Sequence, residues 1–176
     1  QSERKRRASE RDEWVKGCSV DPLRCRIVAA AWAIDDGEPV AMFADDDRSE
    51  RDLIGELWSA IAPCRQRCGY NILNFDDSVL GIRSLLLGVD PLFRIDRNRY
   101  RNSQAIDLMH LVSPSKFYRA KDVASLLRID VPADGIDGSD VFDLYDQGED
   151  EQIIEYVKSD VVIEREIHRQ LRRVFV

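Results

Sequence analysis

The sequence has no long apolar run and no excess of positive charge. Its longest apolar stretch, residues 27–34, is far shorter than the roughly 20 residues that cross a bilayer, so we expect no contact with a membrane. No charged-then-apolar leader opens the chain, and we expect a cytoplasmic protein. The net charge of −7, from 33 acidic and 26 basic residues, argues against a protein that coats duplex DNA through a broad basic surface. A nuclease is still compatible with this charge, because metal-binding carboxylates are themselves acidic and the metal attracts the phosphate.

Cysteines are few, and their spacing is not that of a common zinc site. Cys18 and Cys25 are separated by six residues, and Cys64 and Cys68 by three. Zinc knuckles usually hold two cysteines that are two residues apart. A zinc site is one alternative, and free thiols in a reducing compartment are the interpretation that we favour.

The length of 176 residues suits one domain with a real core. Residues 1–22 predict a charged arm or helix, because charges of both signs alternate there without an apolar stripe, and residues 23–176 predict the domain itself. Residues 26–34 and 39–43 predict an antiparallel hairpin whose first strand is buried on both faces. Further strands are predicted at 67–72 and 105–112, and helices at 49–62, 76–87, 121–127 and 149–174. This order of elements predicts an α/β fold.

Two short motifs carry side chains suited to divalent metal ions. Asn71, Phe75 and Asp76 form Asn-x3-Phe-Asp where a strand gives way to a helix, and a helix N-terminus favours a carboxylate. Tyr156 and Asp160 are four residues apart on the last helix, so their side chains share a face. Taken alone, Asp76 is explained by helix capping, and Tyr156 by a half-buried ring with its hydroxyl in water. Asp160 requires a bound cation or a hydrogen-bond partner, because it lies on the inward side of its helix.

On these motifs the chain resembles the ribonuclease-H-like (DnaQ-like) 3′–5′ exonucleases of the DEDD type. Asn71, Phe75 and Asp76 match the family's second motif, and Tyr156 with Asp160 matches the third motif of its tyrosine subclass. The chain is most similar to stand-alone exonucleases related to the proofreading domain of family B DNA polymerases. The resemblance extends to residues 105–112 and 135–141.

The resemblance implies a mixed sheet flanked by helices and a two-metal phosphodiester hydrolysis that uses Mg²⁺ or Mn²⁺. Asp160 would hold the ion that carries the attacking water, Asp76 would help to hold the other ion, and Tyr156 would orient the water. Asn71 and Phe75 would contact the terminal nucleotide. The implied partner is the 3′ end of a single nucleic-acid strand, with DNA favoured over RNA.

The family's first motif, Asp-x-Glu on a strand, has no match before Arg26. By resemblance that strand is the centre of the sheet, so we expect the domain to lack its N-terminal central strand and to have a defective metal site. A degenerate exonuclease fold that binds nucleic acid or a partner without cutting is the alternative. In a further alternative, Asp76 and Asp160 are only caps and salt-bridge partners. Residues 94–101 and 116–119 mix basic and aromatic side chains, which predicts either strand contacts or solvated loops.

Overall fold

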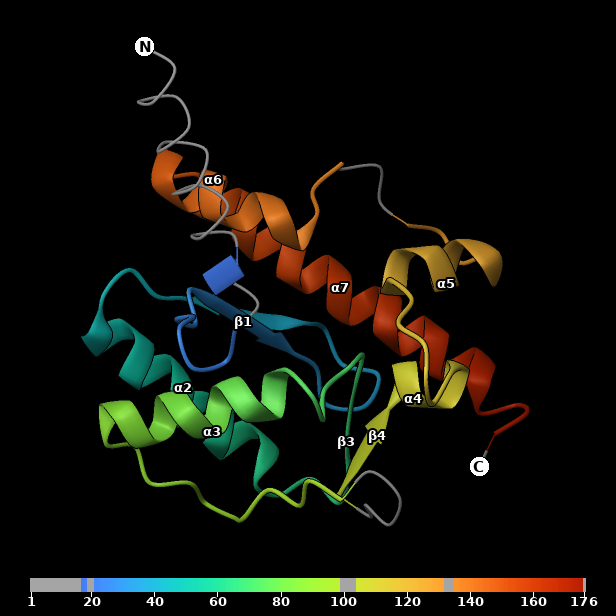
Figure 1. Cartoon of the computed structure of the whole chain (residues 1–176), viewed down its shortest axis with the longest axis horizontal. Helices are drawn as coiled ribbons and strands as arrows, with labels where there is room; N and C mark the ends of the chain where they lie inside the picture. Colours follow the sequence, from blue (N-terminus) through green and yellow to red (C-terminus); the bar gives the residue numbers. More distant parts are fainter. Residues whose placement is uncertain (1–16, 19–20, 99–103, 132–134, 176) are drawn as a thin grey trace.

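A computed structural model describes residues 17–18, 21–98, 104–131 and 135–175 of the chain (Figure 1). Most of the arm predicted over residues 1–22 lies outside these described residues. The described elements, in chain order, are β1 (Ala29–Trp32), β2 (Val40–Phe43), α2 (Asp47–Ile61), β3 (Arg67–Gly69), α3 (Asp76–Leu87), β4 (Ala105–Asp107), α4 (Leu108–Val112), α5 (Ala120–Leu126), the short 3₁₀ helix η1 (Gly138–Asp140), α6 (Val141–Gln147) and α7 (Asp150–Leu171). The fold is therefore mixed α/β, with small sheets and several helices. None of the described helices has the length and apolar character that crossing a membrane demands.

The first sheet is the predicted hairpin, in which β1 and β2 pair antiparallel with Ala29 opposite Phe43 and Trp32 opposite Val40. Asp35 adopts a positive φ of 51° in the turn between them, where aspartate is tolerated. Every residue of β1 is only half-buried, so the prediction of a strand buried on both faces is wrong. Helix α7 packs against β1, and β2 is its single described partner strand, so part of the surface of β1 stays open to solvent.

The second sheet pairs β3 with β4 in parallel, with Arg67 opposite Ala105 and Gly69 opposite Asp107. The prediction of a strand over residues 105–112 is wrong beyond Asp107. There the Asp107 side chain accepts a hydrogen bond from the His110 backbone N–H and caps helix α4. Capping fixes a helical turn where the apolar sequence alone also suits a strand.

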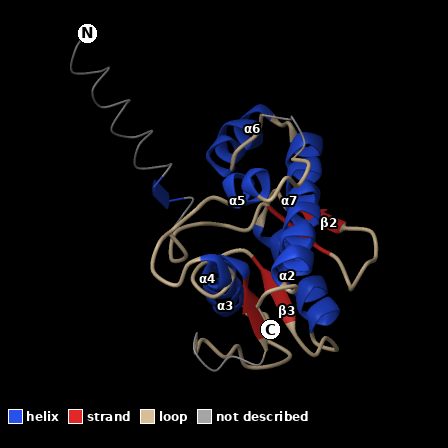
Figure 2. Ribbon diagram, turned by 90° about the vertical axis from the view of Figure 1, so that its right-hand side faces the viewer, coloured by secondary structure: helices blue, strands red, loops and turns tan. Residues whose placement is uncertain are grey.

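The two sheets do not pair with each other among the described residues, and helix α7 joins them. It packs against β1, β2 and β3, with α4, α5 and α6 beside it (Figures 1 and 2). One apolar cluster unites α4, α5 and α7, and its buried members are Leu108, Val123, Ala124, Ile163, Ile167 and Leu171. A second cluster lies around α2 and α3, with Ala44, Leu53, Ile54, Trp58 and Leu80 buried.

Trp58 connects α2 to α3 and to the segment that follows it. Its indole Nε1 donates a hydrogen bond of 2.9 Å to the hydroxyl of Ser84. Its ring meets Phe93 edge to face at a centroid distance of 5.1 Å. Both contacts are of the kind that a buried tryptophan needs, because it combines a large apolar surface with one polar N–H group.

Glu50 is a fully buried charge that ties three elements together. Its carboxylate on α2 accepts hydrogen bonds from Arg83 of α3, at 2.7 Å from Nε and 2.6 Å from Nη2. It also accepts the Ile27 backbone N–H at 2.9 Å, just before β1. With this many partners, the cost of burying the carboxylate charge is compensated. Removing one member of the ion pair would leave the other charge buried and unpaired.

We predict that Glu50→Ala destabilises the fold by about 3–5 kcal/mol, because the guanidinium of Arg83 and the Ile27 N–H lose their acceptor. Urea denaturation followed by circular dichroism measures this difference. Glu56→Ala is the matched control on the exposed face of the same helix, and its effect should stay within about 0.5 kcal/mol. Equal stabilities of the two variants would contradict the prediction.

Candidate functional site

The connection from β3 to α3 carries three of the residues that the sequence singled out. Asn71 follows β3 with a positive φ of 60°, a conformation that asparagine adopts more readily than most residues. Its side-chain oxygen accepts a hydrogen bond of 2.8 Å from Nδ2 of Asn74. Phe75 is half-buried at the N-cap of α3, and Asp76 is the first residue of that helix. The structure thus places all three on a single short connection.

Asp107 fixes the shape of this connection from the neighbouring strand. The parallel register places it beside Gly69, at the end of β3. Its Oδ1 accepts the backbone N–H of Asn71 at 3.1 Å, and its Oδ2 accepts that of Leu73 at 3.2 Å. The carboxylate is buried, and backbone N–H groups compensate its charge. Asp107 was not predicted as a site residue, since nothing in the sequence shows which backbone groups its carboxylate meets.

Helix α7 supplies the second half of the candidate site. Tyr156, Asp160 and Glu164 follow one another at intervals of four residues, so their side chains lie on one face of the helix. All three are half-buried. Helix α7 also contacts β3, the strand that leads into Asn71. The two sequence motifs therefore meet across the interface between α7 and the second sheet.

The charge of Asp160, from the motif on α7, is one of the influences on the carboxyl of Asp76, from the motif at the start of α3. The pKa of the Asp76 carboxyl is raised from 3.8 to about 7, mainly by burial and in smaller part by the charges of Asp77, Asp107 and Asp160, while a backbone hydrogen bond acts in the opposite direction. Asp76 as a whole is nevertheless an exposed residue, so the burial that acts on its carboxyl is incomplete. Water that reaches the carboxylate screens it and makes the shift smaller than complete burial would give.

Glu164 is a site carboxylate that sequence reasoning missed. Burial raises the pKa of its side chain well above the usual value, and the charges of Asp76, Asp160 and Asp107 add to this effect. A hydrogen bond from the Tyr70 backbone acts in the opposite direction. The signal was present in the sequence, because Glu164 lies one helical turn beyond Asp160 on the face that also carries Tyr156.

Tyr156 is held from the side of α5 and the η1 turn. The ammonium of Lys121 lies 5.1 Å from the centre of its ring, a cation–π distance. Its hydroxyl is close to Gly138, where an added Cβ would lie 3.6 Å from the oxygen. Lys121 also donates a hydrogen bond of 2.5 Å to the carbonyl of Ile136. These contacts join α5, the turn and α7 at the tyrosine.

The carboxylates of the candidate site are of the right chemical kind to bind a hard cation, but there are too few of them to form a complete site. Carboxylate oxygens such as those of Asp76 and Asp160 are the ligands that Mg²⁺ and Mn²⁺ prefer, and a cation between them would relieve their repulsion. Within the part of the chain that the structure describes, no group of three or more His, Cys, Asp or Glu side chains is placed to hold a metal ion. All four cysteines are free thiols.

Comparison with known proteins gives a family and one distant relative. Residues 22–164 match the family described as "Predicted 3'-5' exonuclease related to the exonuclease domain of PolB". An uncharacterized protein of Methanocaldococcus jannaschii is 27% identical over 172 residues, which cover 89% of this chain and 92% of that protein. No solved structure is significantly similar to the chain.

We predict that Asp76→Asn makes the chain more stable at neutral and higher pH. A carboxyl with a pKa of about 7 when folded and 3.8 when unfolded holds its proton longer in the folded state, so stability falls as the pH rises between these values. Asparagine removes that loss. The stability gained by Asp76→Asn should increase from pH 4 to pH 7 and reach about 1 kcal/mol, because solvent screening reduces the effect. Above pH 7 it should remain constant.

Thermal unfolding of both proteins across this pH range measures the gain. Asp90→Asn is the matched control, because Asp90 is exposed beyond the opposite end of α3. Parallel stability profiles for wild type and Asp76→Asn would show that the Asp76 carboxyl has no raised pKa.

Proposed function

Since the chain belongs to the family of predicted 3′-5′ exonucleases related to the exonuclease domain of PolB, we propose that it hydrolyses phosphodiester bonds from the 3′ end of single-stranded DNA. The observation that best supports this proposal is that the charge of Asp160 on α7 contributes to the raised pKa of Asp76 at the start of α3. These carboxylates come from separate motifs, and only the fold brings them together. Their close approach is unfavourable in the free protein, which is the usual state of a site that binds cations.

In this proposal the domain is a ribonuclease-H-like exonuclease of the tyrosine subclass. The hairpin β1–β2 and the parallel pair β3–β4 would be the parts of one mixed sheet, flanked by α7 on one side and by α2 and α3 on the other. The parallel pairing of β3 with β4 supports this, because the sites of α/β proteins form at the ends of parallel strands. Asp76 lies just beyond such an end.

The chemistry would divide between the two motifs. Asp160 and Asp76 would hold divalent ions, and bound ions of this kind activate a water molecule and stabilise the leaving 3′ oxygen. The hydroxyl of Tyr156 would orient the water, and its position would depend on the contacts of its ring with Lys121 and of its hydroxyl with Gly138. Asn71 and Phe75 would contact the terminal nucleotide, with the ring of Phe75 suited to stacking on a base.

One observation favours a second candidate function. The described residues contain no group of three metal-binding side chains, and a two-metal site normally needs more ligands than Asp76 and Asp160 supply. A fold that binds the 3′ end without cutting it would need only the nucleotide contacts. The two candidates differ in whether the DNA becomes shorter.

We predict that the full chain shortens a 5′-labelled single-stranded DNA from its 3′ end in millimolar Mn²⁺. Asp160→Asn should abolish this activity without unfolding the protein, because the amide keeps the shape of the side chain and loses the charge. Tyr156→Phe should lower kcat by about 100-fold, since the hydroxyl acts on the water. Denaturing gels and circular dichroism measure the two effects.

Asp150→Asn is the matched control, an exposed aspartate in the first turn of the same helix. Binding of the DNA without any shortening would support the second candidate. Full activity in Asp160→Asn would exclude this site as the place of hydrolysis.

A further inference from the structure

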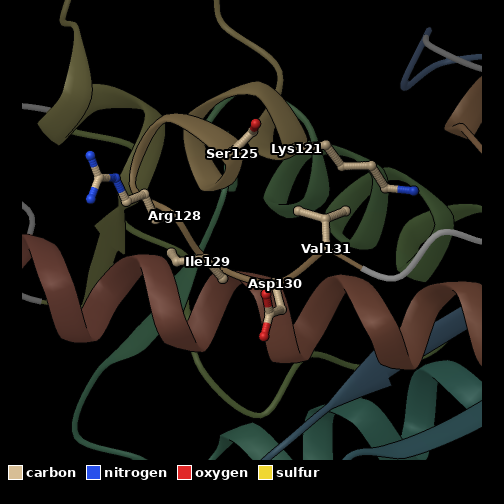
Figure 3. Close-up of a pocket in the computed structure, with 6 residues that line it drawn as sticks. All are labelled: Lys121, Ser125, Arg128, Ile129, Asp130 and Val131. Atoms are coloured by element: carbon tan, nitrogen blue, oxygen red, sulfur yellow. The ribbon is translucent and has the colours of Figure 1, made fainter.

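A hollow of about 470 Å³ adjoins the candidate site along one side of α5 (Figure 3). Its lining comes from the helix and from the chain that returns after it, namely Lys121, Ser125, Arg128, Ile129, Asp130 and Val131. The hollow connects to the site through Lys121, whose ammonium lies 5.1 Å from the centre of the Tyr156 ring. A ligand in this hollow would therefore share one residue, Lys121, with the surroundings of Tyr156.

The charges around the hollow suit a chain of phosphates. Figure 3 shows Lys121 and Arg128 at its two ends, with their charged groups extending outward in opposite directions and Ile129 and Val131 between them. Asp130 is the one carboxylate among the lining residues, so the cations outnumber it. Two separated cations with an apolar floor match a strand whose phosphates are spaced along a backbone, rather than a single phosphate group.

Arg128 is held in a backbone conformation that normally selects glycine. Helix α5 ends in a Schellman motif, in which Ile129 N–H bonds to the carbonyl of Ala124 at 2.9 Å and Arg128 N–H bonds to that of Ser125 at 3.0 Å. This motif places Arg128 in the left-handed region, with a φ of 59°. A long side chain on a strained residue beside a hollow points to a function for that side chain.

The segment before α5 carries further basic and aromatic side chains. Phe117 is 64% exposed, and the ammonium of Lys116 lies 5.2 Å from the centre of the Tyr118 ring. The carbonyl of Tyr118 accepts the hydroxyl of Tyr70, the residue immediately before Asn71. Exposed aromatic rings next to cations are the usual contacts for unpaired bases, so this segment offers such contacts near the terminal-nucleotide residues.

We infer that the hollow beside α5 binds the phosphodiester backbone of single-stranded DNA, with Arg128 and Lys121 as its phosphate contacts and Asp130 as a charge that weakens them. The inference rests on the proposed function, in which single-stranded DNA is the substrate. It adds a second binding region to the residues on α3 and α7, and it explains how an acidic protein with a net charge of −7 can hold a polyanion.

Two substitutions test this inference in opposite directions. Arg128→Gly should weaken the binding of a fluorescent oligothymidylate by about threefold to tenfold and reduce the slope of log affinity against log salt by about 0.7. The same change should raise the melting temperature by about 2–4 °C, because glycine suits the left-handed position. Asp130→Asn should tighten binding by about twofold, because it removes a repelling charge.

Fluorescence anisotropy in EDTA measures binding by the full chain without cleavage. Arg48→Gln on the exposed face of α2, away from α5, is the control for general loss of positive charge and should change neither quantity (Figure 1). If Arg128→Gly weakens binding and Asp130→Asn tightens it, the inference that the hollow binds DNA is supported even if the protein does not cleave DNA. If the protein cleaves DNA but Arg128→Gly and Asp130→Asn leave the affinity and the salt slope unchanged, the inference that the hollow binds DNA is wrong and the proposed function is unaffected. Failure of the chain to bind the oligonucleotide at all also overturns the inference.

Discussion

The packing of α7 against both sheets is the constraint on which the rest of the structure depends. The two sheets share no hydrogen-bonded strand pair among the described residues, so the helix that touches both defines their relation. Its buried residues Ile153, Ile163, Ile167 and Leu171 provide the apolar contact. The same packing sets the position of the stripe Tyr156–Asp160–Glu164 beside the end of β3. The position of α7 therefore determines both the packing of the core and the location of the candidate site.

The carboxylate cluster is unfavourable by itself, and its neighbours show how the fold maintains it. Asp107 is compensated by backbone N–H groups, and Asp77 is paired with the guanidinium of Arg67. Asp76 and Glu164 carry raised pKa values, for which burial is the main cause in both cases. The structure therefore separates carboxylates whose charge is compensated by protein groups from carboxylates whose pKa values are raised by burial beside like charges. Asp76 belongs to the second group, and the charge of Asp160 is one of the causes of its raised pKa.

The sequence predicted those parts of the structure that depend on local pattern. The hairpin and the helix Asp76–Leu87 are confirmed, because alternating or helical apolar spacing and turn residues decide them locally. Helix α2 begins at Asp47, before the predicted start, because Asp46 caps it together with Ser49. The prediction that the strand continues past Asp107 is wrong, because the hydrogen bond from the His110 backbone N–H to the Asp107 side chain stabilises a helix there.

The candidate site was predictable in its motifs but not in its surroundings. Asn71, Phe75, Asp76, Tyr156 and Asp160 follow from spacing, and their roles stay predictions. The roles of Asp107 and Lys121 depend on contacts between segments that are distant in the sequence, and no local pattern encodes such contacts. The half-burial of β1 likewise depends on which strands pair, since its apolar composition alone suggested full burial.

A titration with Mn²⁺, followed by electron paramagnetic resonance, tests the central claim that Asp76 and Asp160 form one cation site. We predict Mn²⁺ binding that is weak, because the described residues place no third ligand there, and that decreases in both Asp76→Asn and Asp160→Asn. Mn²⁺ binding that is unchanged by either substitution would contradict this prediction.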